Sequence, residues 1–373
     1  MSGDGPDGAK YKAIYETLQK EICDGKYDLS QPFPSEMQLV RRFKVSRFTA
    51  VQALKALEMA DLIVRHKGKG TFPTKFAKSS VGPVGLIMPG LAYGEIYAPI
   101  CGEITRLCQR RGRTVLLGNT TAEMPAERAK AAKRLAKDFV AQHVAGVIMH
   151  PIEYLRDSAG ANREIIAIFE QASVPVVLID YDVVPYPQRS SYDLVGIDNF
   201  AAGRRLGEHL ISEGVRNVLF IKRKNCASTV ENRLAGISVA MMSAGLKWTP
   251  ENVVVAEPEN SGTIVRYLKE ASPIPDAVVC GYDVHAARVL KAVEKSIRRI
   301  SIPRDIKLAG FDDVRCASVV SPSLTTIHQP CKEIARGAVE LLFRRFANPD
   351  SPVCTMLLDA PLVVRESTKG PRK

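Results

Sequence analysis

Apolar residues near the amino terminus recur every three or four positions. This spacing places them on one side of a helix that ends near residues 24–25. A second, short helix is expected over residues 34–43, with Pro34 at its first position and Met37 turned toward a core. The pattern therefore predicts two consecutive amphipathic helices in the first part of the chain.

The next segment completes a helix-turn-helix pattern. Ser46 can cap a third helix over residues 47–59, in which Val51, Leu54 and Leu57 would face inward. Helix, tight turn and helix is the geometry that lets the second helix of the pair enter the major groove of DNA. We therefore expect a DNA-reading unit at this end of the chain.

Two short strands follow, joined by a basic tip that is rich in glycine. Residues 62–65 and 71–72 would form the strands, and residues 66–70 the tip. Glycine permits a tight turn, and Lys67 and Lys69 can neutralise DNA phosphates. A nucleotide-binding phosphate loop is the alternative, but its terminal lysine-serine or lysine-threonine pair and its following helix are absent. The pattern favours a wing.

Three motifs in this segment occur in a fixed order: PSEMQLVRRFKVSRFT, ALKALEMADLI and GKGTF. Together they make residues 10–73 similar to the GntR family of winged-helix regulators. The resemblance implies that DNA is contacted at the helix starts and along the wing, the latter against the minor groove. The residues concerned are Ser35, Ser46, Arg47, Thr49, His66, Lys67, Gly68, Lys69 and Gly70.

Two positions depart from the GntR pattern. The family usually has an arginine after the glutamate of the first motif and another in the third helix, where this chain has Met37 and Val51. Two customary DNA-contacting charges are therefore missing, and base preference should differ from that of typical relatives. Gln52, beside the second gap, either reads an adenine edge by paired hydrogen bonds or is an idle surface side chain.

Beyond residue 83, short β-branched runs alternate with longer amphipathic segments. We expect a head over residues 1–74, a polar linker over residues 75–83 and a second domain over residues 84–373. Regular strand-helix alternation predicts an α/β fold whose parallel sheets carry helices on both faces. The expected strands are residues 84–88, 114–117, 144–149, 174–179, 195–197, 218–221 and 277–280, and the expected helices include residues 100–111, 126–142, 199–212 and 283–295.

The motifs of this second part also occur in a recognisable order: VGLIMPG, VAGVIMHP, SVPVVLID, VGIDNFAAGRRLGEHLI, ENRLAGI, PDAVVCGYD, IPRDIKLAGFDDV, SPSLTTIHQP and VVRESTKG. Over residues 84–370 the chain resembles the LacI/GalR-type sensor, a relative of periplasmic sugar-binding proteins. The resemblance implies two similar lobes joined by three crossovers, an effector held between them, and a side-by-side homodimer.

The same resemblance implies an effector site. Arg233 matches an arginine that forks onto the effector, Asp312 a strand-end acid that accepts hydrogen bonds from it, and Thr229 a common hydroxyl contact. The other positions implied are Tyr93, Glu95, Ile96, Tyr97, Tyr181, Asp182, Tyr282 and Asp283.

Structural roles remain open for several of these residues. Arg233 and Asp312 could pair only to hold the lobes together, and Tyr93, Glu95 and Tyr97 could be ordinary surface-loop residues. Two further acids have structural interpretations as well. Asp198 and Asn199 begin a helix, where capping is the expected role, and Asp313 could merely turn the chain.

Charge and composition agree with a regulator that binds nucleic acid. The net charge is +12, and residues 1–78 hold 14 lysines and arginines against 9 acids. Eight scattered cysteines and six unclustered histidines predict no metal site and a reduced, cytoplasmic protein. Neither an export signal nor an apolar run long enough for a membrane span is present, so no membrane partner is expected.

These features predict a repressor that a small carbohydrate releases from double-stranded operator DNA. We expect no enzyme and no cofactor, because no GxGxxG fingerprint follows any of the expected strands and no GxSxG or SxxK motif appears. The alternatives are a solute-binding protein for transport, a GntR head fused to an aminotransferase-like domain, and a regulator whose ligand raises its DNA affinity. The sequence does not identify the effector.

Overall fold

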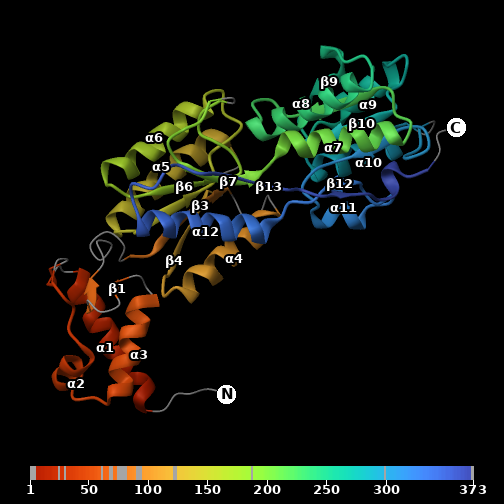
Figure 1. The fold of residues 1–373 in the computed structure, drawn as a ribbon. Helices are drawn as coiled ribbons and strands as arrows, with labels where there is room; N and C mark the ends of the chain where they lie inside the picture. The colour runs from red at the N-terminus through yellow and green to blue at the C-terminus, as the bar shows by residue number, and fades with distance from the viewer. Residues whose placement is uncertain are drawn as a thin grey trace.

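The amino-terminal head is a three-helix body with a two-stranded wing (Figure 1). Its apolar side chains, Leu18, Leu39 and Leu57 among them, form one small core. The computed structural model describes residues 6–23, 26–28, 31–59, 62–66, 70–73, 82–89, 95–120, 124–185, 188–297 and 300–370. The head elements are α1 (Pro6–Cys23), α2 (Glu36–Phe43), α3 (Arg47–Met59), β1 (Ile63–His66) and β2 (Gly70–Pro73). Strands β1 and β2 pair antiparallel, which confirms the predicted wing.

Helix α2 begins two residues later than the pattern predicted, so Pro34 is not its first residue. The Ser35 hydroxyl accepts a hydrogen bond from the Gln38 backbone N–H, and the Gln38 side chain accepts one from the Ser35 N–H. This capping box satisfies two backbone donors that a helix start leaves free, and it therefore sets the boundary.

Two side chains that were predicted to face the core of the head do not. Met37 is 53% exposed, because two residues along a helix turn it about 200° from the buried Leu39. Val51 is only half-buried. Both residues lie on the outer surface of the helix-turn-helix unit.

The first lobe of the second domain is a parallel six-stranded sheet in the order β13-β7-β6-β5-β3-β4. Helices α4 and α12 pack together on one face, and α5 and α6 cover the other (Figure 1). The strands are β3 (Val84–Pro89), β4 (Val115–Thr120), β5 (Gly146–Met149), β6 (Val176–Ile179), β7 (Asp193–Ile197) and β13 (Thr355–Leu358). The helices are α4 (Tyr97–Arg110), α5 (Pro125–Ala141), α6 (Ser158–Gln171) and α12 (Cys331–Ala347).

The second lobe is a parallel four-stranded sheet in the order β11-β10-β8-β9, also covered by helices. Its strands are β8 (Val218–Lys222), β9 (Val253–Val255), β10 (Ala277–Cys280) and β11 (Lys307–Ala309). Its helices are α7 (Asn199–Ser212), α8 (Ser228–Ser243), α9 (Ser261–Glu270), α10 (Asp283–Ser296) and the short α11 (Arg315–Val319), with 3-10 turns at Pro250–Asn252 and Glu366–Thr368. All seven predicted strands are present, and each begins within two residues of its predicted start.

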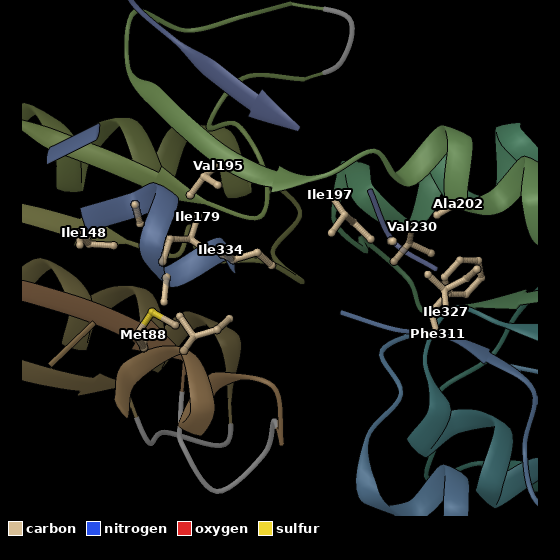
Figure 2. Close-up of a cluster of buried hydrophobic side chains, with 14 of the residues drawn as sticks. Met88, Ile148, Ile179, Val195, Ile197, Ala202, Val230, Phe311, Ile327 and Ile334 are labelled. Atoms are coloured by element: carbon tan, nitrogen blue, oxygen red, sulfur yellow. The ribbon is translucent and has the colours of Figure 1, made fainter. Parts of the chain in front are cut away.

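The chain passes between the lobes at residues 197–198, 328–330 and 359–361. Two of these crossovers lie side by side, because β12 (Thr326–Ile327) pairs antiparallel with β14 (Leu362–Val363). Buried apolar side chains accompany the connection on both sides, as Figure 2 shows for Val195 in the first lobe and Ile197 facing the second. The lobes are therefore separate layered units joined by a narrow, packed hinge, as the fold class predicted.

Helices α7 and α8 approach each other unusually closely because glycines lie at their crossing. A Cβ added at Gly203 would lie 2.1 Å from the Arg233 carbonyl oxygen, and one at Gly236 would lie 2.1 Å from the Phe200 carbonyl oxygen. Only glycine leaves room for such backbone contact. The crossing holds the amino-terminal turn of α7 directly beside Arg233 on α8.

Candidate functional site

The start of α3 is fixed by the residue that the sequence predicted as its cap. The Ser46 hydroxyl accepts a hydrogen bond from the Thr49 backbone N–H at 3.1 Å. The hydroxyl of Thr49 lies 2.7 Å from the same Ser46 oxygen, and Thr49 has no exposed surface. The structure therefore places Thr49 in the helix cap, where its hydroxyl is already bonded, and not on the DNA-facing surface that the family resemblance implied.

An ion-pair network joins the three elements that would approach DNA. The Nε of Arg47, whose side chain is 75% exposed, donates to the Glu36 carboxylate at 3.1 Å. The same carboxylate lies 3.9 Å from Arg65 on β1. Glu36 thus links the starts of α2 and α3 to the wing, and its charge restrains Arg47 before DNA arrives. Gln52 is half-buried on the same helix as Arg47.

The wing is described only along its strands. His66 and Gly70 form the last pair of the ladder, and both are exposed. Gly70 has a φ of 110°, a conformation that favours glycine. The other predicted contacts of the tip, Lys67, Gly68 and Lys69, lie outside the described residues.

A cavity of about 640 Å³ lies between the two lobes. It is lined by residues that follow the carboxyl ends of strands in both sheets, where ligands of parallel α/β folds bind. The first lobe contributes Glu95, Ile96, Tyr97, Met124, Arg128, Glu153, Tyr154 and Asp180. The second lobe and the hinge contribute Arg223, Thr229, Val230, Arg233, Pro258, Glu259, Tyr282, Val284, His285, Arg288, Asp312, Val314 and Gln329.

Arg233 is the most constrained cation of the cavity. It is 3% exposed, and its guanidinium donates to Asn199 Oδ1 at 2.8 Å and to the Gly281 carbonyl at 2.7 Å. It also lies 3.4 Å from the Asp312 carboxylate. Burial raises the pKa of that carboxyl, although the positive charge of Arg233 opposes the shift. The predicted pairing and the predicted position in the cavity therefore coexist, and the arginine is oriented before any ligand binds.

Tyrosines from both lobes meet across the cavity. The Tyr154 hydroxyl donates to the Tyr282 hydroxyl at 3.2 Å, and the Tyr154 N–H donates to the Asn225 carbonyl at 3.1 Å. The Arg223 guanidinium lies 4.1 Å from the centre of the Tyr154 ring. Burial raises the pKa of the Tyr97 and Tyr154 hydroxyls well above the usual value, so both remain protonated donors.

A buried histidine, His150, lies beside Tyr97 and Asp180 of the cavity lining. His150 Nε2 lies 3.3 Å from the Tyr97 hydroxyl and 3.6 Å from the Asp180 carboxylate. Burial lowers the pKa of His150, but Asp180, Glu153 and the Pro151 carbonyl together outweigh this effect and leave the pKa raised. Burial also raises the pKa of the Glu153 carboxyl. The cavity therefore offers protonated hydroxyls and hydrogen-bonding carboxyls close to one another.

Seven residues that the resemblance implied as effector contacts line this cavity: Glu95, Ile96, Tyr97, Thr229, Arg233, Tyr282 and Asp312. Three others are placed elsewhere, and Tyr93 lies outside the described residues. Tyr181 and Asp182 line a neighbouring pocket of about 260 Å³, where the Tyr181 hydroxyl donates to the Pro151 carbonyl and Asp182 accepts from loop N–H groups. Asp283 lies buried beneath the cavity and accepts hydrogen bonds from Thr326 and Val314.

Capping explains part of the remaining pattern. The Asp198 carboxylate accepts from the Ala201 N–H and caps α7, as predicted. Asn199 has a second role, because its amide oxygen receives Arg233. Asp313 does more than turn the chain, since its carboxylate also pairs with Arg365 and with His328.

Sequence reasoning missed several lining residues with polar side chains: Arg128, Glu153, Tyr154, Asp180, Arg223, Glu259, His285, Arg288 and Gln329. A signal existed for some of them. Asp180 directly follows strand β6, and Arg223 directly follows β8, the position at which the cavity residues of such sheets gather. His285 and Arg288 lie on α10, where the sequence alone does not show which helix face meets the cavity.

His285 gives the protein a measurable dependence on pH. Burial, with help from Arg223 and Arg288, lowers its pKa to about 4, although Glu257 and Glu259 oppose the shift. The unfolded chain binds a proton near pH 6.5 and the folded chain does not, so this group destabilises the fold as pH falls from about 6.5 to 4. The free energy of unfolding of the wild type should therefore fall between pH 7 and pH 5. We expect His285→Gln to reduce this fall by about 2 kcal/mol, measured by urea unfolding.

The control for this experiment is His143→Asn at an exposed histidine, which should follow the wild-type pH profile. Identical profiles for the wild type and His285→Gln would show that His285 does not titrate in this way.

Within the described residues, no three side chains of the histidine, cysteine or acidic type are grouped closely enough to hold a metal ion. A search of the same residues finds no helix that combines the length and the apolar character of a bilayer-crossing segment.

Two family models match the chain. Residues 10–72 match bacterial regulatory proteins of the gntR family, and residues 208–368 match the periplasmic binding protein-like domain. The HTH-type transcriptional repressor PurR of Klebsiella pneumoniae is 30% identical over 275 residues, which are 73% of this chain and 75% of that protein. PurR of Pasteurella multocida is 28% identical over 290 residues, 77% of this chain and 81% of that protein.

Solved structures show the same fold. The transcriptional regulator CelR in complex with cellobiose superposes with a TM-score of 0.66 at 24% identity, covering 87% of this chain and 92% of that one. The transcription regulator GntR of Chromobacterium violaceum gives a TM-score of 0.63 at 22% identity, covering 77% and 100%.

The matches agree with the geometry described above. A winged helix-turn-helix head is joined to a two-lobed domain with a cavity, and repressors align with this chain over most of their length. The chain therefore belongs to the family of bacterial transcriptional repressors that includes these PurR proteins, and it carries a DNA-binding head of the gntR type.

Proposed function

We propose that this regulator binds a small carbohydrate between its lobes and that this binding releases a homodimer from operator DNA. The observation that carries the proposal is the cavity of about 640 Å³, which is lined by residues of both lobes and by Gln329 of the hinge. We also propose that the head comprises residues 1–74, the linker residues 75–83 and the sensor residues 84–373, and that the protein is not an enzyme. On this basis it would act in the cytoplasm.

The chemistry of the cavity favours a neutral ligand that is rich in hydroxyl groups. Three of its lining arginines already have acidic partners: Arg233 pairs with Asp312, Arg223 with Glu257 and Arg288 with Glu259. A ligand need not bring a compensating charge. Carboxylates and guanidinium forks suit vicinal hydroxyls, and tyrosine rings pack against the apolar faces of sugars. Similar regulators have been solved with cellobiose and with ribose, which supports the same ligand class here.

Ligand binding could reach DNA through the hinge. Tyr154 of the first lobe contacts Asn225, Arg223 and Tyr282 of the second, so a ligand seated among them would favour closed lobes. In a dimer, closure would change the spacing of the two heads. This change would weaken operator binding by a coupling free energy of about 1–3 kcal/mol. Two-fold symmetry would then require a pseudo-palindromic operator.

The test is a thermal-shift screen of the purified protein against mono- and disaccharides, followed by DNA binding with and without each hit. A ligand that binds only the folded state raises the melting temperature by mass action. Nucleosides form the comparison panel, because their planar rings would also stack on tyrosine. A shift produced by nucleosides alone would overturn the carbohydrate proposal, and a sugar that strengthens DNA binding would reverse the sign of regulation. Footprinting that shows one asymmetric contact would contradict the dimer.

A further inference from the structure

A large aromatic side chain lies uncovered at the start of α3. Phe48 is 66% exposed, whereas Ala50, Ala53, Leu54 and Leu57 of the same helix are buried. A single exposed apolar residue is ordinary on a protein surface, so its position must decide whether it matters. Phe48 is the second residue of the second helix in the helix-turn-helix unit, and the first residues of that helix meet base edges.

The helical period places Phe48 in the middle of the outward face. At about 100° per residue, it lies between Val51 and Gln52 and in line with Lys55. The opposite face of the helix is the buried one, with Thr49 held in the cap. The outward face therefore presents an aromatic ring at its centre.

Charged neighbours fix how this face would approach a duplex. Arg47 lies at one edge of the face, restrained by Glu36, and Lys55 is exposed one turn past Val51. Both cations can contact phosphates, which set the register of a protein on DNA without reading sequence. The ring between them would then be directed into the groove.

A phenyl ring cannot exchange hydrogen bonds with the donors and acceptors of base edges. In the major groove the apolar group available to it is the C5-methyl of thymine. We propose that Phe48 reads a thymine methyl group in each half-site, and that this apolar contact replaces readout by the arginines that are missing at Met37 and Val51. The inference rests on the DNA-binding role and is independent of the effector.

The experiment begins with duplexes selected by the full-length protein from a random-sequence pool. Each thymine of the selected site is then replaced with deoxyuridine, which pairs identically but lacks the methyl group. We expect one position per half-site at which the replacement weakens binding about four-fold, and about fifteen-fold when both half-sites are changed. Phe48→Thr should abolish this sensitivity, whereas Phe48→Leu should keep most of it.

Met59→Thr is the matched control, because Met59 is also exposed on α3 but lies at its far end. It should show the wild-type pattern of deoxyuridine sensitivity. Equal binding of thymine and uracil duplexes by the wild type, or unchanged sensitivity in Phe48→Thr, would overturn the role of Phe48. Failure to select any duplex would instead count against DNA reading by this head, so the two failures are distinguishable.

Discussion

Replacing Arg233 with alanine is expected to abolish the thermal shift produced by the best sugar and to lower the free energy of unfolding by about 3 kcal/mol. The guanidinium is buried and contacts Asn199, Gly281 and Asp312 together, so its removal leaves the Asn199 and Gly281 oxygens without this donor and Asp312 without its positive partner. The same fork would hold the ligand. The measurements are urea unfolding and thermal melting with and without the sugar.

Two further variants separate binding from folding. Arg233→Lys keeps the charge but loses the planar fork, so it should fold more stably than the alanine variant and still bind the sugar weakly. Arg204→Ala removes an exposed arginine of α7 that pairs only locally with Glu208, and it should change stability by less than about 0.5 kcal/mol. A full sugar-dependent shift in Arg233→Ala would show that the effector does not use this residue.

Gly236→Ala is expected to destabilise the second lobe by about 3 kcal/mol, with loss of ligand binding. The new methyl group would lie 2.1 Å from the Phe200 carbonyl oxygen and 2.6 Å from the Arg204 nitrogen, both backbone atoms that cannot rotate away. Helices α7 and α8 would have to separate, and Asn199 would move away from Arg233. Equilibrium unfolding and the sugar-induced shift report the two consequences.

Gly102→Ala is the matched control, because it is the same substitution in the interior of helix α4. A Cβ at Gly102 meets nothing within 4 Å. Alanine restricts the unfolded chain more than glycine does, so this variant should be more stable by about 0.5–1 kcal/mol. Equal stability of the Gly236→Ala variant and the wild type would mean that the helices can move apart without cost.

Local sequence patterns predicted the elements and their caps well. The alternation of short β-branched runs with amphipathic segments predicted all seven strands that were named, and Ser46 and Asp198 cap their helices as expected. These features depend on residues only a few positions apart. The boundary of α2 was predicted less well, because Pro34 and Ser35 both favour a helix start and only the capping box with Gln38 distinguishes them.

Side-chain direction was harder to predict than element position. Thr49 and Asp283 have polar groups suited to binding, yet each is buried and bonded within the protein. Met37 and Phe48 are apolar, yet both are exposed on the head. Residue type alone cannot show which face of a helix meets a core, because neighbours distant in the chain decide it.

The sequence by itself determined the order of the elements, the winged head, the parallel sheets and part of the cavity lining, because periodicity, caps and motifs are local. Tertiary structure decided which side chains share the cavity. Glu153, Arg223 and His285 follow different strands in two lobes, and they meet only because the sheets face each other across a hinge. The separation of these residues along the sequence does not show that they lie close together, because their proximity depends on how the two sheets and their helices pack.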